Sequence, residues 1–233
     1  MELKAIIIGA IGALVETSEM QRRAFNAAFE RAGLDWTWER KAYQQMLSVS
    51  GGRNRISAYA EQTNTTLTED QIASVHATKS DIYQQAMRDL GLALRPGVAD
   101  LIQSASEAGI KLAFASTTSA ENIQAIGAAL GDASPYTHFA VMTHSDTVQN
   151  RKPAPDVYLH VLEQLNISAD RAIAIEDTHE SMMSAVNAGI ACVATPGDYV
   201  RNQDFSEAVA IADPGQIADV EWLRSLIATP TPA

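Results

Sequence analysis

Three short segments carry polar residues that could do chemistry, and a glycine-rich turn precedes them in the chain. The turn is Gly9–Ala13, and the polar segments are Ser116–Thr118, Arg151–Pro153 and Glu176–Asp177. They supply hydroxyl groups, a lysine ammonium and two carboxylates. Each segment lies where we expect a strand to end, and in open parallel sheets ligands bind beyond the carboxyl ends of the strands. The spacing therefore predicts one shared ligand site at one edge of a sheet.

The elements that must position these residues alternate between strand and helix in the second part of the chain. The apolar, β-branched run Lys4–Ile8 is typical of a buried strand. Further strands are predicted at Lys111–Ala115, Phe139–Met142, Ala172–Ile175 and Ile190–Thr195. Helices are predicted between them, at Val98–Ala108, Ala120–Leu130, Ala154–Leu165 and His179–Ala188. This alternation predicts an α/β fold with a mostly parallel sheet.

A purely helical block separates the first strand from the rest. Helices are predicted at Thr17–Ala32, Trp38–Leu47, Arg55–Gln62 and Thr68–Asp89. We therefore expect residues 1–15 and 91–228 to form a core domain, and residues 16–90 to form an inserted helical cap domain. Residues 229–233 contain two prolines and are expected to form a flexible tail.

Composition excludes several classes of partner. The formal net charge of -11 is unfavourable for binding to nucleic acid or to an anionic membrane surface. No apolar run reaches the roughly 18 residues that a membrane span needs. The single cysteine, Cys192, rules out an intrachain disulfide, so we expect a cytoplasmic location.

The order and content of the four segments resemble the haloacid dehalogenase superfamily, in the group of β-phosphoglucomutase and CbbY-type sugar-phosphate phosphatases. The Lys-Pro-x-Pro-Asp pattern at Lys152–Asp156 and the acidic pair Glu176–Asp177 are its most specific features. The resemblance covers nearly the whole chain. It implies a Rossmann-like core with a parallel sheet and an inserted all-helical cap.

The resemblance also implies a role for each segment. Ser116, Thr117 and Lys152 correspond to the group that binds phosphate, and Glu176 and Asp177 to the carboxylates that hold Mg²⁺. In the cap, the loop containing Gly51, Gly52, Arg53 and Arg55 resembles a loop that contacts substrate. A family histidine in the first cap helix is replaced by Gln21.

The first motif of the family is degenerate in this chain. Gly9 stands where the resemblance places a nucleophilic aspartate, Ile11 where it places an acid/base aspartate, and Ala13 where it places a threonine. A covalent phosphoryl intermediate needs the first carboxylate, and proton transfer needs the second. We therefore expect a catalytically silent or strongly impaired phosphatase scaffold. Anion binding by Ser116 and Lys152 is expected to persist, together with the N–H groups of residues 10–13.

Other interpretations of the same residues stay open on sequence alone. Ser116 is also a candidate N-cap for the helix Ala120–Leu130, and the pair Glu176–Asp177 is a candidate cap for the helix that follows it. Arg53 and Arg55 could be solvated cations at the start of a helix. Without metal, Lys152 could pair with Glu176 or Asp177 and close the site.

Two other functions compete with the silent scaffold. One is residual Mg²⁺-dependent hydrolysis of a small sugar phosphate, and the other is a protein-interaction or regulatory module. The expected ligand is a small phosphorylated molecule, any Mg²⁺ binding is expected to be weak, and the sequence names no protein partner.

Overall fold

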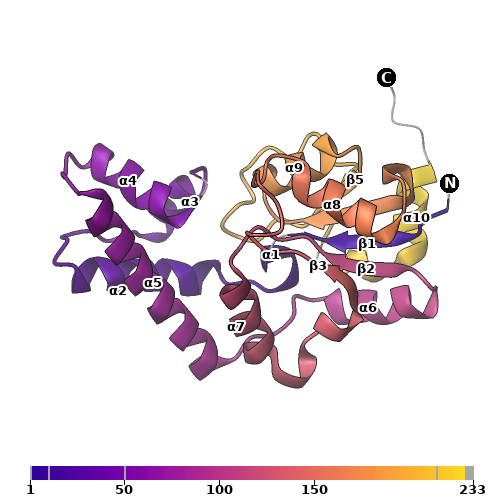
Figure 1. The fold of residues 1–233 in the computed structure, drawn as a ribbon, viewed down its shortest axis with the longest axis horizontal. Coiled ribbons are helices and arrows are strands. Elements are labelled where there is room, and N and C mark those ends of the chain that lie inside the picture. The colour runs from indigo at the N-terminus through magenta and orange to yellow at the C-terminus, as the bar shows by residue number, and fades with distance from the viewer. Residues whose placement is uncertain (1, 10, 50, 214, 229–233) are drawn as a thin grey trace. The chain divides into compact units, whose positions relative to one another are not determined.

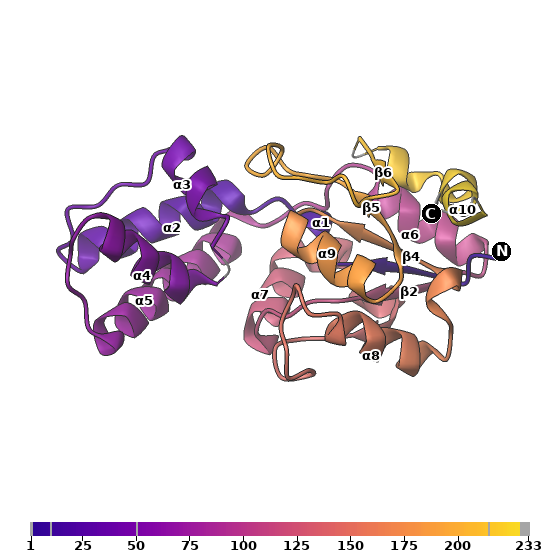
Figure 2. The ribbon, with the colours of Figure 1, turned by 90° about the horizontal axis from the view of Figure 1, so that it is seen from above.

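The computed structural model describes residues 2–9, 11–49, 51–213 and 215–228. It divides into two units, Met1–Glu16 with Leu92–Ala233, and Thr17–Gly91. Figures 1 and 2 show the ribbon of both units from two directions. No helix among the described residues is long and apolar enough to cross a membrane.

The first unit is built on a parallel sheet in the order β3-β2-β1-β4-β5-β6. The strands are β1 (Ala5–Ile8), β2 (Lys111–Phe114), β3 (Phe139–Met142), β4 (Ala172–Glu176), β5 (Ala191–Ala194) and β6 (Ala210–Ile211). The α/β fold with a parallel sheet is confirmed. The sequence pattern did not predict β6, because this edge strand has only two residues.

Helices cover both faces of this sheet, as expected for strands that are apolar on both sides. The helices are α1 (Ile11–Leu14), α6 (Val98–Glu107), α7 (Ala120–Leu130), α8 (Asp156–Leu165), α9 (His179–Asn187) and α10 (Val220–Ala228). Short 3-10 turns are η1 (Gly131–Ala133), η2 (Tyr136–His138), η3 (Ala169–Arg171) and η4 (Gln216–Ala218). In Figure 1, α8 and α9 lie over one face of the sheet and α6 lies against the other.

The core under α8 and α9 explains why the central strands are so apolar. Val157, Tyr158 and Val161 of α8 and Met182 of α9 pack against the small inward-facing residues of the strands. Cys192 is buried in this same cluster. Two-sided burial of this kind requires strands without polar residues along their length, so the polar groups are left at the strand ends.

The second unit is helical, and the structure describes no strand in it. Its helices are α2 (Ser18–Arg31), α3 (Arg40–Met46), α4 (Gly52–Gln62) and α5 (Glu69–Leu90). Phe25 and Phe29 of α2 form an aromatic cluster with Trp36, Trp38, Tyr43 and Tyr59. Such a cluster gives the unit an apolar core of its own. The long helix α5 begins with a capping box between Thr68 and Gln71.

Two expectations about local structure were wrong. The segment Gly9–Ala13 after β1 was expected to be a glycine-rich turn, but Ile11–Leu14 form the one-turn helix α1. Arg55 was expected to begin α4, but this helix begins three residues earlier, at Gly52. In both cases, a glycine lowers the helix propensity of the segment. The segment is nevertheless helical, because tertiary context can override weak propensity.

Candidate functional site

Register brings the predicted strand ends together at one edge of the sheet. Ile8, the last residue of β1, is opposite Phe114 of β2 and Ile175 of β4. The N–H of Gly9 continues this pairing with a 2.8 Å hydrogen bond to the carbonyl oxygen of Ile175. Gly9 and Ser116 follow β1 and β2, and Glu176 is the last residue of β4, so the three lie at the same edge of the sheet.

Glu176 is the centre of the site, and its side chain is fully buried. Lys152 Nζ lies 2.5 Å from Glu176 Oε1. The Tyr158 hydroxyl donates a second hydrogen bond to the same oxygen. Two donors on one oxygen compensate part of the cost of burying a carboxylate away from water. Lys152 was expected to pair with either Glu176 or Asp177, and in the structure it pairs with Glu176.

The Glu176 carboxylate also fills the space beside Gly9. A methyl group built on Gly9 would collide with all three atoms of this carboxylate group. The absence of a side chain at position 9 is therefore a packing requirement of the observed site. A larger residue at that position requires the Glu176 carboxylate to shift.

Asp177 packs in a similar way against the next turn. A methyl group on Gly12 would collide with Asp177 Oδ2. Asp177 Oδ1 is buried and has no hydrogen-bond partner among the described residues. Burial first, and then the neighbouring charge of Glu176, raise the pKa of Asp177 to about 7. Glu176 Oε1 thus accepts two hydrogen bonds, whereas Asp177 Oδ1 accepts none from the described residues.

Arg95 holds the turn that contains Gly12. Its Nη1 donates to the carbonyl oxygens of Gly12 at 2.7 Å and Thr195 at 2.6 Å. The residue is 9% exposed. It was not predicted as a site residue, and the only signal was a lone cation directly before Pro96–Gly97. Its position fixes the backbone beside Asp177.

Ser116 lies at the end of β2 and is tied into the backbone. Its N–H donates to Thr143 Oγ1 at 2.9 Å, and its own Oγ accepts from the Thr118 N–H at 3.2 Å. Thr117 is partly buried beside it. The alternative role of Ser116 as an N-cap was wrong, because Ser119 caps α7 through the Asn122 N–H. Ser116 remains a candidate for anion binding.

The structure also shows where the residues of the acidic pair and of the first motif lie. Thr178 is the N-cap residue of α9, with its side chain accepting from the Ser181 N–H, and Glu176 and Asp177 precede it in the chain. Ile11 is partly exposed and Ala13 is buried, and both lie in α1. The expected contribution of the residue 10 N–H lies outside the described residues.

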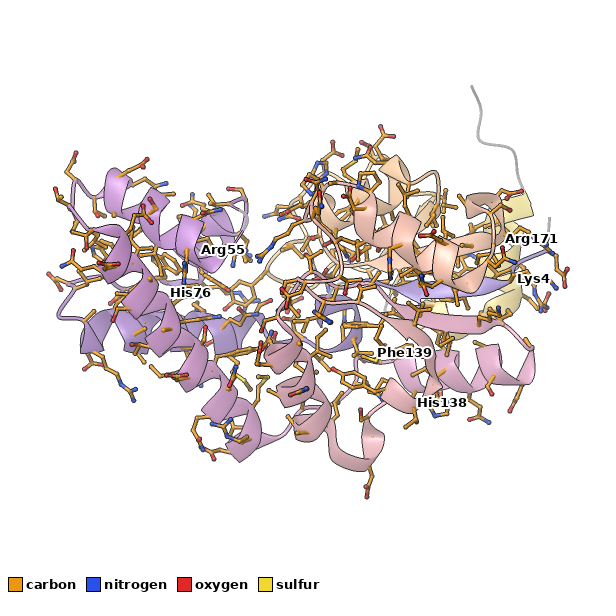
Figure 3. The ribbon with its side chains drawn as sticks, in the orientation of Figure 1. Lys4, Arg55, His76, His138, Phe139 and Arg171 are labelled. Carbon is orange, nitrogen blue, oxygen red and sulfur yellow. The ribbon has the colours of Figure 1, made fainter. Side chains whose placement is uncertain are left out.

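The residues predicted to form a substrate-contacting loop lie at the start of α4 in the second unit. Gly51 is the N-cap, with φ of 82°, and Gly52 is the first helical residue. Arg53 is exposed, whereas Arg55 is partly buried and its Nε donates to the Val49 carbonyl oxygen at 2.8 Å. Arg55 is therefore not simply a solvated cation. Figure 3 labels Arg55 on α4 and His76 on α5 of the same unit.

A cavity of about 410 Å³ lies apart from these residues, between α6 and the segment 132–138. Ile102, Glu107, Asp132 and His138 are among the residues that line it. None of the predicted site residues contributes to its wall. No sequence motif predicted this cavity, because its lining residues form no motif.

Comparison with known proteins gives a consistent set of relatives. The family model described as haloacid dehalogenase-like hydrolase matches residues 12–195. Protein CbbY of Cereibacter sphaeroides is 37% identical over 211 residues, covering 91% of this chain and 92% of that protein. Protein CbbY of Rhodobacter capsulatus is 38% identical over 208 residues, covering 89% and 92%.

Solved structures agree with these sequence matches. The crystal structure of CbbY from Rhodobacter sphaeroides in complex with phosphate has a TM-score of 0.83 and 36% identity, covering 94% of this chain and 96% of that one. A variant of the same protein was solved with xylulose-(1,5)bisphosphate and gives the same scores. The family model begins its match at residue 12, after Gly9 and Ile11.

Proposed function

The chain belongs to the haloacid dehalogenase-like hydrolase family, and we propose that it is a catalytically silent member that keeps the phosphatase scaffold. The observation that carries this proposal is the end of β1. Gly9 has no side chain that could attack phosphorus, and Ile11 has none that could carry a proton. The space beside Gly9 holds the Glu176 carboxylate, which is already bound by Lys152 and Tyr158.

The expected losses in rate favour a catalytically silent protein over one with slow turnover. General acid–base catalysis contributes roughly 10²–10⁴ in rate. Loss of a catalytic unit that includes the nucleophile costs on the order of 10⁶. Both losses apply to the same phosphoryl transfer, so we expect turnover close to the uncatalysed rate.

Resident Mg²⁺ fits these residues poorly. Mg²⁺ prefers a near-octahedral set of oxygen ligands. Glu176 is neutralised by Lys152, and Asp177 Oδ1 is a single buried oxygen without a partner. The structure describes no cluster of three or more acidic, histidine or cysteine residues able to hold a metal. We therefore propose only weak Mg²⁺ binding, and assign it no step in a reaction.

The proposed ligand is a small phosphorylated molecule bound at Ser116, Thr117 and Lys152. Support comes from relatives, since CbbY was crystallised with phosphate and with xylulose-(1,5)bisphosphate. In this chain an anion must compete with Glu176 for the Lys152 ammonium. We therefore expect weaker phosphate binding than a site with an unpaired lysine would give. We also propose that the unit Thr17–Gly91 is the cap, and that the protein is cytoplasmic, in line with its single buried cysteine.

A steady-state assay tests the proposal. The full-length protein is incubated with Mg²⁺ and a panel of sugar phosphates that includes xylulose 1,5-bisphosphate, and phosphate release is measured. We expect no release above the uncatalysed rate. Mg²⁺-dependent turnover that disappears in both K152A and D177N would overturn the proposal.

Residual phosphatase activity is the second candidate, because Ser116, Lys152, Glu176 and Asp177 are all retained. The same assay decides between the two candidates. The third candidate, an interaction module, is tested by the mass of the protein in solution, measured by light scattering after size exclusion. A concentration-independent monomer mass would count against self-association.

A further inference from the structure

The cavity of about 410 Å³ beside α6 has no part in the proposed function. Its described lining residues all belong to the unit built on the sheet, so its shape does not depend on the helical unit. Ile102 and Pro135 are buried and form apolar parts of its wall, and Leu94 and Ala133 extend this apolar surface. Small-molecule sites of this size combine apolar walls with a few polar groups.

The charged groups in the wall are carboxylates. Glu107 is the last residue of α6 and Asp132 lies in η1, and both side chains line the cavity and are exposed. Gln103 Nε2 donates to Glu107 Oε1 at 2.9 Å, but this neutral amide does not cancel the charge. No lysine or arginine is among the described lining residues. The cavity therefore offers two negative charges without a competing cation in its wall.

The basic residues closest along the chain are engaged elsewhere. Arg95 and Lys111 are the only arginine and lysine between residues 90 and 150. Arg95 donates to the carbonyl oxygens of Gly12 and Thr195, and Lys111 Nζ donates to the Leu165 carbonyl oxygen at 3.2 Å. Neither lines the cavity.

Two helix ends add to the negative potential. The helix α6 ends at Glu107, and α7 ends at Leu130, two residues before Asp132. The C-terminal end of a helix carries a partial negative charge, which a basic residue in the last turn often compensates. Neither helix has a basic residue in its last turn. A positively charged ligand would supply the missing compensation.

We propose that this cavity binds an aliphatic polyamine cation. Its ammonium groups pair with Glu107 and Asp132, and its methylene segments lie against the apolar wall that contains Ile102 and Pro135. Exposed ion pairs contribute little binding energy by themselves, so the apolar contacts must supply part of the affinity. This combination favours a polyamine over a compact metal cation or a neutral chain. The proposal is independent of the phosphate site, because none of that site's residues lines the cavity.

A titration of the full-length, ¹⁵N-labelled protein with spermidine, followed by NMR, tests the proposal. His138 also lines the cavity (Figure 3), so the titration is run at pH 7.5, where histidine side chains are normally neutral. We expect saturable shifts at the amides of residues 94–107 and 132–138, with a dissociation constant on the order of 1 mM or below. Shifts that do not saturate, or that spread evenly over all acidic surfaces, would overturn the proposal.

Two double variants separate this site from general attraction to a protein of net charge -11. E107Q/D132N removes both carboxylate charges from the wall and keeps the side-chain shapes, and we expect binding to weaken at least about tenfold. E163Q/D170N is the matched control, because it removes one glutamate and one aspartate charge from exposed residues of α8 and η3. We expect this control to bind nearly as wild type does. Equal weakening in both variants would show attraction by net charge alone and would refute the site.

Two further probes test the class of ligand. The compound 1,8-octanediol has a chain as long as that of spermidine but no charge, and Mg²⁺ has charge but no apolar segment. We expect each to bind at least about tenfold more weakly than spermidine at this cavity. Equal affinity for the diol would contradict recognition by the carboxylates. Equal affinity for Mg²⁺, with shifts at the same amides, would contradict the contribution of the apolar wall.

Discussion

At the scale of single residues, Glu176 shows how a motif residue persists without its motif. Its carboxylate has two donors, Lys152 and Tyr158, that satisfy it inside the protein. This contact set is stable without a ligand, because charge and hydrogen bonding are balanced locally. The contacts of Lys152 and Glu176 with one another are therefore sufficient to explain their presence on structural grounds.

Breaking this ion pair is expected to destabilise the protein. K152M removes the cation that pairs with the buried Glu176 carboxylate, and we expect a loss of about 3–5 kcal/mol in the free energy of unfolding. Urea denaturation measures this loss. The double variant K152M/E176Q removes both charges and should recover much of it. A loss below about 1 kcal/mol in K152M would show that the pair is not the anchor of the site.

Gly9 should tolerate no side chain while Glu176 keeps its place. G9A is expected to destabilise the protein by about 1–3 kcal/mol, because its methyl group must push the carboxylate from its donors. G215A is the matched control, since a methyl group there meets no atom within 4 Å and its φ of -74° suits alanine. Thermal melts of both variants check the difference. Equal melting temperatures would contradict the observed packing.

Lys79 gives a pH dependence whose sign follows from its burial on α5, where its Nζ donates a 2.8 Å hydrogen bond to Gln21 Oε1. Burial first, and then the Arg55 guanidinium, lower the pKa of Lys79 to about 7. Between pH 7 and about 10.5 the unfolded chain binds a proton at Lys79 that the folded protein does not. Stability therefore rises with pH in this window. We expect wild type to gain stability relative to K79M from pH 7 to pH 10. Parallel denaturation curves at several pH values measure the difference, and a constant offset between the two proteins would contradict it.

At the scale of elements, helix ends and strand ends carry most of the local information. Thr68 and Gln71 exchange two hydrogen bonds at the start of α5, of 3.2 Å and 2.8 Å. The strand ends place Gly9 and Glu176 side by side because β1 pairs directly with β4. A cap can thus be identified from four consecutive residues, whereas the pairing of two strands cannot.

The capping box of α5 should contribute measurably to stability. T68A removes the acceptor for the Gln71 N–H, and we expect a loss of about 1 kcal/mol in the free energy of unfolding. T66A changes a neighbouring exposed threonine and is expected to be nearly neutral. Chemical denaturation of both variants provides the comparison. Equal effects of the two substitutions would mean that the box does not stabilise the helix.

At the scale of the whole molecule, the chain passes twice between two units with separate cores. The unit Thr17–Gly91 has its own aromatic cluster, and the other unit has its sheet between two layers of helices. Separate cores favour separate cooperative unfolding.

Native-state hydrogen exchange tests this independence. With rising denaturant below the main transition, we expect the amides of α2–α5 to exchange as one group and those of β1, β2, β4 and β5 as another. The two groups should differ in opening free energy, because their cores differ in size and composition. One common opening energy for all these amides would show a single cooperative unit.

The sequence alone determined the alternation of strands β1–β5 with helices, the family, and the lack of carboxylates at positions 9 and 11. These follow from local patterns, such as the apolar run of β1, the Lys152–Asp156 motif and the spacing of the four segments. The strand Phe139–Met142 and the helix Ala120–Leu130 were predicted to the residue. Hydrophobic periodicity and short motifs are properties of neighbouring residues, and so they can be found without a fold.

Only the tertiary structure decided which groups meet. Lys152 and Glu176 are 24 positions apart and Gln21 and Lys79 are 58 apart, so packing of distant elements sets both contacts. The sequence left the partner of Lys152 open between two acids, and it gave no role to Tyr158 or Lys79. The apolar face of α5 did hold a signal, since Lys79 lies between Val75 and Tyr83 at helical spacing. A buried charge acquires its properties from desolvation and from its neighbours in space, and neither can be derived from periodicity.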